Sequence, residues 1–325
     1  MFRRLLCAFV LLTLFLTPRA ADAQQADRRP ARIGLVSLHA QELASHVDGI
    51  RQELQKLGYV EGKTITIDSH FTNGDKERTR EILKSFVESK VDVIVPWTTQ
   101  TVELAMETTQ TIPIVMIASD PIAAGLVPNL SRPGGNVTGV SMSGPDLAGK
   151  RLELLREIKP DIKTVAFLGY APSRGAAEFV RESQANADKI GMTVLVRLVQ
   201  RVEDVNEALF AAMKADGAEA VIVQPFFTGH AAEISAYGLS SGLPVIADYP
   251  SFVKAGAFAS LGVDLNAQVR RTAYFIDRIL KGAKPAELPV EQPTKFELVI
   301  NARTAKALGV ALSPLLLARA DEVVE

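Results

Sequence analysis

Short apolar runs that end abruptly in polar residues recur through this sequence and restrict its architecture. The clearest run covers residues 112–118, is rich in isoleucine and valine, and is followed by Ser119, Asp120 and Pro121. A run that is so short and so apolar favours a strand buried in a parallel sheet over a helix. The segments between the runs carry apolar residues at three- and four-residue spacing, which is typical of amphipathic helices. Strands that alternate with helices predict βαβ units and parallel sheets.

The alternation occurs twice along the chain. Strands are expected to begin near residues 32, 91 and 112 in the first half and near 164, 219 and 243 in the second. The third run of each half contains a proline and is followed by an aspartate, Asp120 or Asp248. The pattern predicts an α/β fold with two doubly wound parallel-sheet lobes joined by a hinge. Because ligands bind beyond the carboxyl ends of strands in such sheets, the two facing edges would enclose a cleft.

The length of the chain agrees with two domains. It has 325 residues, whereas single cores stop growing at roughly 250–300 residues. We expect lobe 1 to comprise residues 32–140 with about 264–284, and lobe 2 to comprise 145–262 with part of 286–325. Crossings that act as a hinge are expected near 138–144, 261–266 and 285–296. Pro96 is expected to end the strand over 91–95, and residues 315–324 are expected to form a helix or a frayed tail.

The N-terminus has the pattern of a secretory signal peptide, residues 1–23. Arg3 and Arg4 precede the apolar run 5–16, and an A-x-A site follows that ends at Ala23. A membrane-spanning helix is the alternative, but it needs about 20 apolar residues. Cleavage after Ala23 also removes Cys7, the only cysteine. The mature chain would then be free of thiols, which suits export to an oxidising periplasm.

Charge and motif content argue against several functions. The formal net charge is −1 and no basic block occurs, so nucleic acid is not an expected partner. The sequence has no G-x-S-x-G, P-loop or G-x-G-x-x-G motif. Its four histidines, at 39, 46, 70 and 230, lack the spacing of metal ligands. We therefore expect no catalytic residue, no metal and no cofactor, and hence a binding protein rather than an enzyme.

Several longer motifs carry a resemblance to a known family. They are LGYVEG at 57–62, DPIAAGL at 120–126, SRPGGN at 131–136, and the segment 279–301 that contains LPVEQPTKFELVIN. With them the chain, from about residue 32 to its end, resembles the substrate-binding proteins of ABC transporters related to tryptophan/tyrosine-type uptake systems. The resemblance implies a type I periplasmic-binding-protein fold and a secreted receptor, usually a monomer, that hands a small ligand to a membrane permease and its ATPase. It leaves the identity of the ligand open.

Polar residues at the expected strand ends are candidate ligand contacts. Asp120 can pair with a ligand amine, although closing the turn before Pro121 would equally explain it. Thr98 and Thr99 begin an expected helix, where free N–H groups suit a carboxylate, and an ordinary N-cap is the alternative. The full set of predicted ligand-binding residues is Ser37, Leu38, His39, Trp97, Thr98, Thr99, Asp120, Pro121, Tyr170, Phe226, Phe227, Asp248 and Tyr249.

Aromatic residues make up only 6% of the chain, yet several follow expected strands, as in Tyr170, Phe226 and Tyr249. As a group they favour a pocket for an apolar or aromatic ligand, while each one alone is explained as well by covering a sheet edge. The expected function is capture of an amino acid, an aromatic acid or a related carboxylate by the receptor of an ABC importer. The alternative that remains open is a ligand-sensing partner of a membrane signalling protein.

Overall fold

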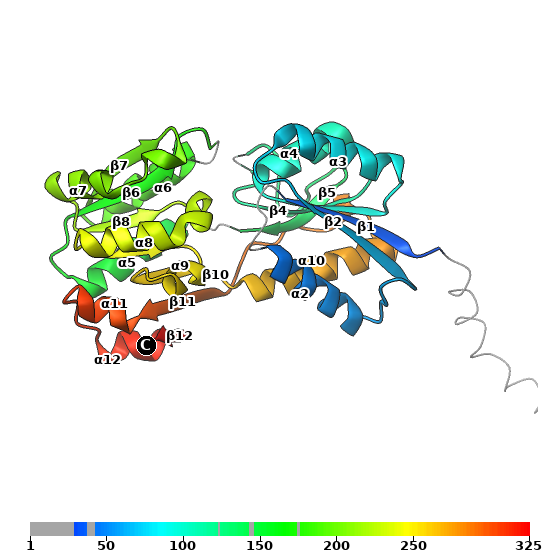
Figure 1. Cartoon of the computed structure of the whole chain (residues 1–325). Coiled ribbons are helices and arrows are strands. Elements are labelled where there is room, and N and C mark those ends of the chain that lie inside the picture. The colour runs from blue at the N-terminus through cyan, green and yellow to red at the C-terminus, as the bar shows by residue number, and fades with distance from the viewer. Residues whose placement is uncertain (1–28, 38–42, 123, 143–145, 174–175) are drawn as a thin grey trace, which may run out of the picture.

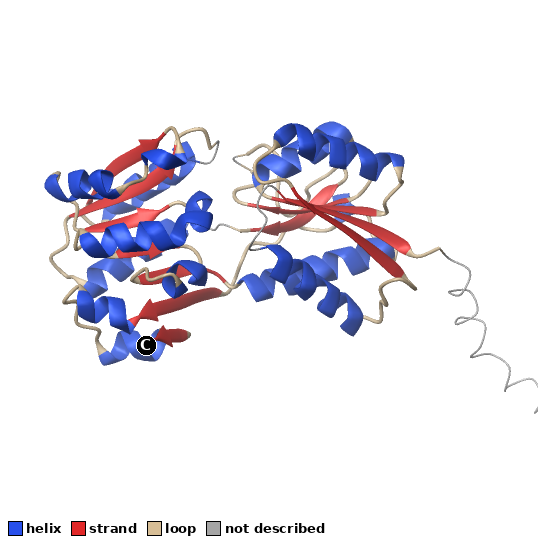
Figure 2. Cartoon of the chain, viewed as in Figure 1, coloured by secondary structure: helices blue, strands red, loops and turns tan. Residues whose placement is uncertain are grey.

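The computed structural model describes residues 29–37, 43–122, 124–142, 146–173 and 176–325, which form two α/β lobes (Figure 1). Each lobe has a sheet with helices on both of its faces (Figure 2). The lobe that contains the N-terminal strand is called lobe 1, and the other is called lobe 2. The α/β architecture with two parallel-sheet lobes that the sequence predicts is confirmed.

Lobe 1 is built on a five-stranded sheet in the order β2-β1-β3-β4-β5, in which all neighbours are parallel. Its strands are β1 (Ala31–Ser37), β2 (Ile65–Phe71), β3 (Val93–Trp97), β4 (Ile114–Ala118) and β5 (Val137–Ser141). Helices α2 (Leu43–Lys56) and α10 (Leu265–Leu280) cover one face, and α3 (Lys76–Glu88) and α4 (Thr99–Thr108) cover the other. The valine- and isoleucine-rich strands thus supply two cores, because their side chains alternate between the faces.

Lobe 2 is built on a seven-stranded sheet in the order β12-β11-β10-β9-β8-β6-β7. Its strands are β6 (Thr164–Tyr170), β7 (Thr193–Val199), β8 (Ala220–Val223), β9 (Val245–Ala247), β10 (Ala259–Val263), β11 (Phe296–Asn301) and β12 (Glu322–Val324). One face packs against α5 (Asp146–Ile158), α6 (Ala176–Lys189), α11 (Ala302–Ala307) and α12 (Pro314–Arg319). The other packs against α7 (Glu207–Ala215), α8 (Ala231–Ser240) and α9 (Pro250–Lys254). The short 3-10 turns are η1 (Val202–Asp204), η2 (Pro225–His230) and η3 (Pro285–Glu287).

One strand of lobe 2 runs against the others. β11 is antiparallel to β10, whereas the other neighbouring strands of the sheet are parallel. The route of the chain explains this exception. After β10 the chain crosses to lobe 1, forms α10, and returns, so it enters β11 from the end of the sheet at which β10 finished. A strand that starts at the carboxyl edge of its neighbour must run antiparallel to it.

Two sequence expectations are wrong in detail. β3 continues through Pro96 to Trp97, with Pro96 in register with Val36 of β1, so the proline lies inside the strand. The end of the chain forms the short helix α12 followed by β12, where one helix or a frayed tail was expected over 315–324. β12 pairs with β11 over Glu322–Val324, and this sheet contact decides the conformation of a segment whose own pattern is helical.

The segments that connect the lobes lie side by side. Glu291 donates its N–H to Gly139 O (3.0 Å) and accepts from Ser141 N–H (2.8 Å), so the returning chain runs along β5. Asp264, which caps the start of α10, donates its N–H to Lys295 O at 3.2 Å. The described parts of the connections thus form a narrow strip between the lobes.

Some of the predicted features lie outside the described residues. They are the expected signal peptide, residues 1–23, and the candidate ligand contacts Leu38 and His39. Within the described ranges, none of the helices has both the length and the apolar character needed to cross a membrane.

Candidate functional site

The carboxyl ends of the strands of lobe 1 bring together several of the predicted ligand contacts. Ser37 of β1 is in register with Trp97 of β3, and Trp97 is in register with Ile117 of β4. Ser37 is fully buried, and the chain leaves β3 and β4 through Thr98 and Ser119. The hydroxyl-rich ends of the three central strands therefore form one continuous edge.

Thr98 occupies a strained position at this edge. Its φ and ψ are 92° and 144°, a region that β-branched residues rarely adopt, and such strain is concentrated at functional sites. Surrounding contacts hold it there: its N–H donates to Ile117 O at 2.9 Å, and its Oγ1 caps α4 by accepting from Thr101 N–H at 3.3 Å. Thr99 Oγ1 accepts from Ser119 N–H at 3.2 Å. The start of α4 is thus fastened to the end of β4.

The carboxylate of Asp120 closes a turn in lobe 1 and also lies close to two carboxylates of lobe 2. Its Oδ1 accepts from Ile122 N–H at 3.1 Å, which is the turn closure that the sequence offered as the alternative. Its carboxylate also meets Glu178 and Glu182 of α6 in lobe 2, with one oxygen of each within 4.8 Å of the others. Burial, and then repulsion by Glu178 and Asp120, raise the pKa of Glu182 to about 7. The next residue, Pro121, is buried, and its carbonyl accepts from Leu126 N–H at 2.8 Å.

At the edge of lobe 2, Tyr170 and Phe226 form what we call the aromatic shelf. The rings lie parallel, with centroids 4.0 Å apart and planes at 5°, and both residues are half-buried. Phe227 contacts both rings edge-on from the core, where it is fully buried. Gln224, which the sequence analysis did not single out, supports the shelf: its Oε1 accepts from Tyr170 N–H at 2.8 Å and its Nε2 donates to Ser173 Oγ at 3.2 Å. The sequence signal that could have identified Gln224 is its position directly after a buried strand.

Trp97 belongs to the core of lobe 1 more than to its edge. Only 8% of its surface is exposed, and it packs in the cluster beneath α2 and α10. Its ring stacks on His46 of α2, with centroids 4.9 Å apart and planes at 19°. Burial lowers the pKa of His46, which favours a neutral imidazole against the indole. Of the predicted aromatic contacts, Trp97 and Phe227 are therefore core residues, whereas Tyr170 and Phe226 remain partly accessible.

Asp248 follows β9 and is held by an arginine that the sequence analysis missed. Arg151 of α5 is 3% exposed; its Nη2 lies 2.9 Å from Asp248 Oδ2, and its Nε donates to Leu261 O at 2.9 Å. Burial raises the pKa of Asp248, and the charge of Arg151 opposes that shift. Tyr249, the next residue, is half-buried at the start of α9. A basic residue on an amphipathic helix gives no sequence signal of such burial.

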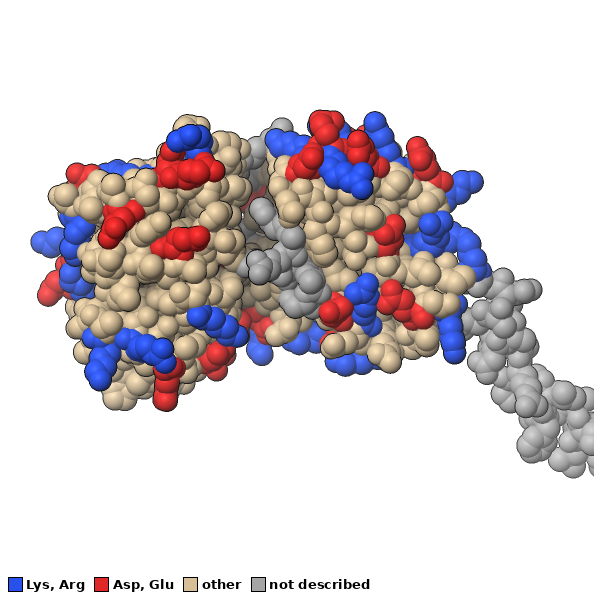
Figure 3. Space-filling view, in the orientation of Figure 1, with Lys and Arg blue, Asp and Glu red and all other residues tan. Residues whose placement is uncertain are grey.

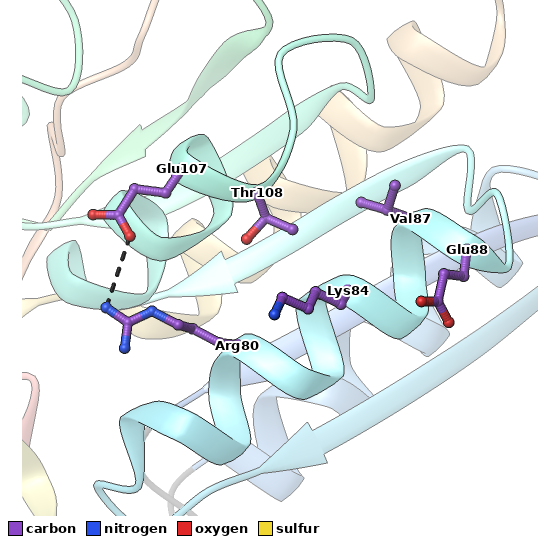
Figure 4. Close-up of a pocket in the computed structure, with 6 residues that line it drawn as sticks. All are labelled: Arg80, Lys84, Val87, Glu88, Glu107 and Thr108. Atoms are coloured by element: carbon purple, nitrogen blue, oxygen red, sulfur yellow. Dashed lines mark ion pairs between the residues drawn. The ribbon is translucent and has the colours of Figure 1, made fainter.

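Other depressions are present on the described surface. One hollow of about 400 Å³ lies between α3 and α4 of lobe 1 and is lined by charged side chains, with Arg80 3.8 Å from Glu107 (Figure 4). Another, of about 520 Å³, lies where residues 291–295 pass the start of α10. The space-filling view shows a furrow between the lobes (Figure 3). The furrow lies between the edges of the two lobes at which the strands end, where α/β sheets bind ligands.

The chain has two sheet-based lobes whose connections lie side by side, and polar and aromatic residues at the strand ends that face each other. This is the architecture of a two-lobed binding protein of the type I periplasmic-binding-protein fold. Residues 35–324 match the model of the ABC transporter substrate binding protein family, and the chain belongs to that family. The family that the sequence motifs resemble is thereby confirmed.

Individual relatives agree with this assignment. The chain is 28% identical over 265 residues to a tyrosine-binding protein of Clostridioides difficile, covering 81% of this chain and 76% of that one. It is also similar to a Streptococcus pneumoniae ABC domain solved in complex with L-Trp, with 28% identity, a TM-score of 0.84 and coverage of 91% and 100%. A ligand-free, open substrate-binding protein with adhesive properties from Clostridium difficile has 26% identity, a TM-score of 0.73 and coverage of 91% and 99%.

Proposed function

We propose that this protein is the solute receptor of an ABC importer and that its ligand is an aromatic amino acid or a related aromatic carboxylate. The observation that carries the proposal is the aromatic shelf, in which two half-buried rings lie parallel at the edge of lobe 2. An aromatic side chain can stack on such rings and bury its apolar faces there. Relatives solved with L-Trp or named for tyrosine support the same ligand class.

The lobes would close over the ligand. Ser37, Thr98 and Thr99 of lobe 1 would cover it from the side opposite the shelf. Asp120 would belong to the contact between the lobes, because its carboxylate meets Glu178 and Glu182 of lobe 2. We assign residues 138–144, 261–266 and 285–296 to the hinge, with lobe 1 as 32–140 plus about 264–284, and lobe 2 as 145–262 plus part of 286–325.

The similarity to solved structures supports a closed arrangement of the lobes. The L-Trp complex and the ligand-free, open structure have nearly equal identity to this chain, 28% and 26%, but their TM-scores are 0.84 and 0.73. This chain is more similar in shape to the ligand-bound structure than to the open one, although its sequence is nearly equally similar to both. A closed arrangement of its lobes would explain this. Ligand would then shift an open–closed equilibrium by binding the closed form more tightly.

The receptor would work in the periplasm. The charged and apolar pattern of residues 1–23, which ends in an A-x-A site at Ala23, supports export with cleavage after Ala23. The mature chain would act as a monomer without catalytic activity, and would deliver its ligand to a membrane permease and its ATPase, as its family implies.

Calorimetry on the mature protein, residues 24–325, tests the proposed ligand class. L-Tryptophan, L-tyrosine and L-phenylalanine are compared with L-leucine, L-lysine and ribose. We expect at least one aromatic amino acid to bind much more tightly than the aliphatic, basic and sugar ligands. Equal or tighter binding of a non-aromatic ligand would remove the reason for assigning the shelf to ligand stacking.

Uptake of the labelled ligand by cells with and without the gene tests delivery to a permease. Loss of uptake on deletion, restored by the wild-type gene, is the result expected of an importer receptor. Tight binding in vitro with unchanged uptake would instead favour the sensing alternative.

A further inference from the structure

The ion pair between Arg151 and Asp248 leaves buried polar atoms without hydrogen bonds to any described residue. Within the part of the chain that the structure describes, Arg151 Nη2 and Asp248 Oδ1 are both buried and have no hydrogen-bond partner. The 2.9 Å approach of Nη2 to Oδ2 is a charge contact without hydrogen-bond alignment. The pair therefore keeps one cationic donor and one anionic acceptor unused, although buried polar groups in proteins are normally satisfied.

Such a pair contributes little to the stability of a lobe. The free energy lost in removing two charges from water is offset only when the geometry is good and further hydrogen bonds satisfy the remaining atoms. Here burial raises the pKa of Asp248 against the attraction of Arg151, and Oδ1 of the carboxylate has no donor among the described residues. A second positively charged donor at Oδ1 would remove this deficit.

The fold holds the pair in a fixed place at the carboxyl edge of lobe 2. Arg151 is fixed by its hydrogen bond to Leu261 O of β10. The backbone of Asp248 packs so closely on Gly262 that a Cβ there would lie 1.8 Å from Asp248 O. β10 then leads directly into the connection to α10. The pair thus lies beside the segment that joins the lobes.

The pair is also within reach of the aromatic shelf. Asp248 follows β9, Phe226 follows β8, and Tyr170 ends β6; these strands are consecutive in the sheet. Neighbouring strands lie about 4.8 Å apart, so the strand that carries Asp248 is roughly 5–10 Å from those that carry the shelf. A small ligand can span that separation, with a ring on the shelf and its polar end at the pair.

We infer that Asp248 and Arg151 bind the zwitterionic head group of the ligand: Asp248 Oδ1 accepts from its ammonium group and Arg151 Nη2 donates to its carboxylate. A cationic donor beside an anionic acceptor is the complement of an α-amino acid head group. The inference rests on the proposed function and narrows it from aromatic carboxylates in general to aromatic amino acids. Both atoms are covered in this structure, so opening of the lobes must uncover them before the head group can bind.

Ligand analogues test the inference on the wild-type protein. Calorimetry compares L-tryptophan with indole-3-propionate, which lacks the amine, and with tryptamine, which lacks the carboxylate; 3-(4-hydroxyphenyl)propionate and tyramine serve if L-tyrosine binds more tightly. We expect each analogue to bind about 30-fold more weakly or worse, because losing one partner of a buried charge pair leaves the other unpaired. An analogue that binds within about threefold of the amino acid overturns the assignment of the corresponding residue.

Variants locate the effect. Asp248→Asn should weaken the amino acid to the level of the deaminated analogue while leaving the affinity for that analogue unchanged, and Arg151→Gln should do the same for the decarboxylated analogue. A general loss of structure would weaken all ligands together. Asp277→Asn is the matched control, because Asp277 is a buried carboxylate on α10, 3.0 Å from Tyr59 Oη and remote from the strand ends. It should keep the full discrimination between ligands.

The outcomes separate this inference from the proposed function. If no aromatic compound binds the wild-type protein, the proposed function fails. If aromatic amino acids and their deaminated analogues bind equally, the proposed function stands and the head-group assignment fails. If the Asp248→Asn variant still binds the amino acid more tightly than its deaminated analogue, the head-group assignment also fails.

Discussion

The facing edges of the two lobes are built from different chemistry. Lobe 1 presents hydroxyl groups at the ends of its strands and a strained threonine that caps α4. Lobe 2 presents the aromatic shelf and a buried ion pair. Stacked rings and desolvated charges can provide much of the free energy of small-ligand binding, whereas hydroxyl groups mainly add orientation. Under the proposed function, lobe 2 would therefore supply most of the affinity and lobe 1 would complete the enclosure.

The largest expected effect concerns stability and contrasts the buried pair of lobe 2 with the exposed pairs of lobe 1. Arg151→Met should lower the free energy of unfolding by about 3–5 kcal/mol, because it leaves Asp248 buried without its counter-charge. Arg78→Met, which breaks an exposed pair with Glu81 on α3, should change it by less than about 1 kcal/mol. Urea denaturation measures both. Similar losses in the two variants would contradict the contrast between buried and exposed pairs.

Next in size is the loss of affinity when the shelf is removed. Phe226→Ala or Tyr170→Ala should weaken binding of an aromatic amino acid by about 10- to 100-fold, since each ring contributes roughly 1.5–3 kcal/mol of apolar contact. Tyr237→Ala is the control: Tyr237 is another half-buried tyrosine of lobe 2 that contacts a phenylalanine ring, but it lies on α8. Calorimetry should show little change in affinity for that variant. Unchanged affinity in both shelf variants would place the ligand elsewhere.

A smaller effect is expected at Thr98 of lobe 1. Thr98→Gly should raise the free energy of unfolding by about 1 kcal/mol, because relief of a strained φ is worth 1–3 kcal/mol and glycine is nearly as good an N-cap as threonine. Thr98→Ala keeps the strain and loses the cap, so it should lower the stability by about 1 kcal/mol. Thermal and urea unfolding at one pH measure the pair. If both variants are destabilised equally, the positive φ is not strained in solution.

The smallest effect is a dependence of closure on pH. In this structure burial and the neighbouring carboxylates raise the pKa of Glu182 from its ordinary value to about 7. The repulsion by Asp120 acts across the lobe contact and would be relieved on opening, whereas Glu178 lies on the same helix as Glu182 and acts in both forms. The closed form would therefore hold the proton of Glu182 more tightly than the open form, so closure is favoured at acid pH and is progressively disfavoured as the pH rises to about 7. Affinity for the ligand should therefore fall a few-fold between pH 5 and pH 8, a change kept small by the partial exposure of Glu182 to solvent.

Glu182→Gln separates this contribution from other titrations. The variant should bind with nearly the same affinity at both pH values, and should match the wild type at pH 5. Calorimetry at the two pH values provides the comparison. A wild-type affinity that rises with pH would contradict the role of the three carboxylates at the lobe contact.

Much of the fold follows from local pattern. The runs near residues 32, 112 and 164 formed strands because short, β-branched apolar segments are satisfied only inside a sheet. Asp120 and Asp248 were placed at strand ends by the same reasoning. Pro96 and the last segment were misjudged because their conformations depend on partners: Val36 lies beside the first, and β11 pairs with the second. Contacts between residues far apart in sequence have no local signature.

The sequence alone determined the two α/β lobes, the family, and the polar and aromatic character of the strand ends, since these depend on periodicity and residue type. Only the tertiary structure decided that Trp97 packs into the core, that Gln224 supports the shelf, and that Arg151 lies buried against Asp248. Burial of an arginine is decided by which helix face meets which strand end. That choice is made by packing across the whole lobe, so a chain read one segment at a time cannot reveal it.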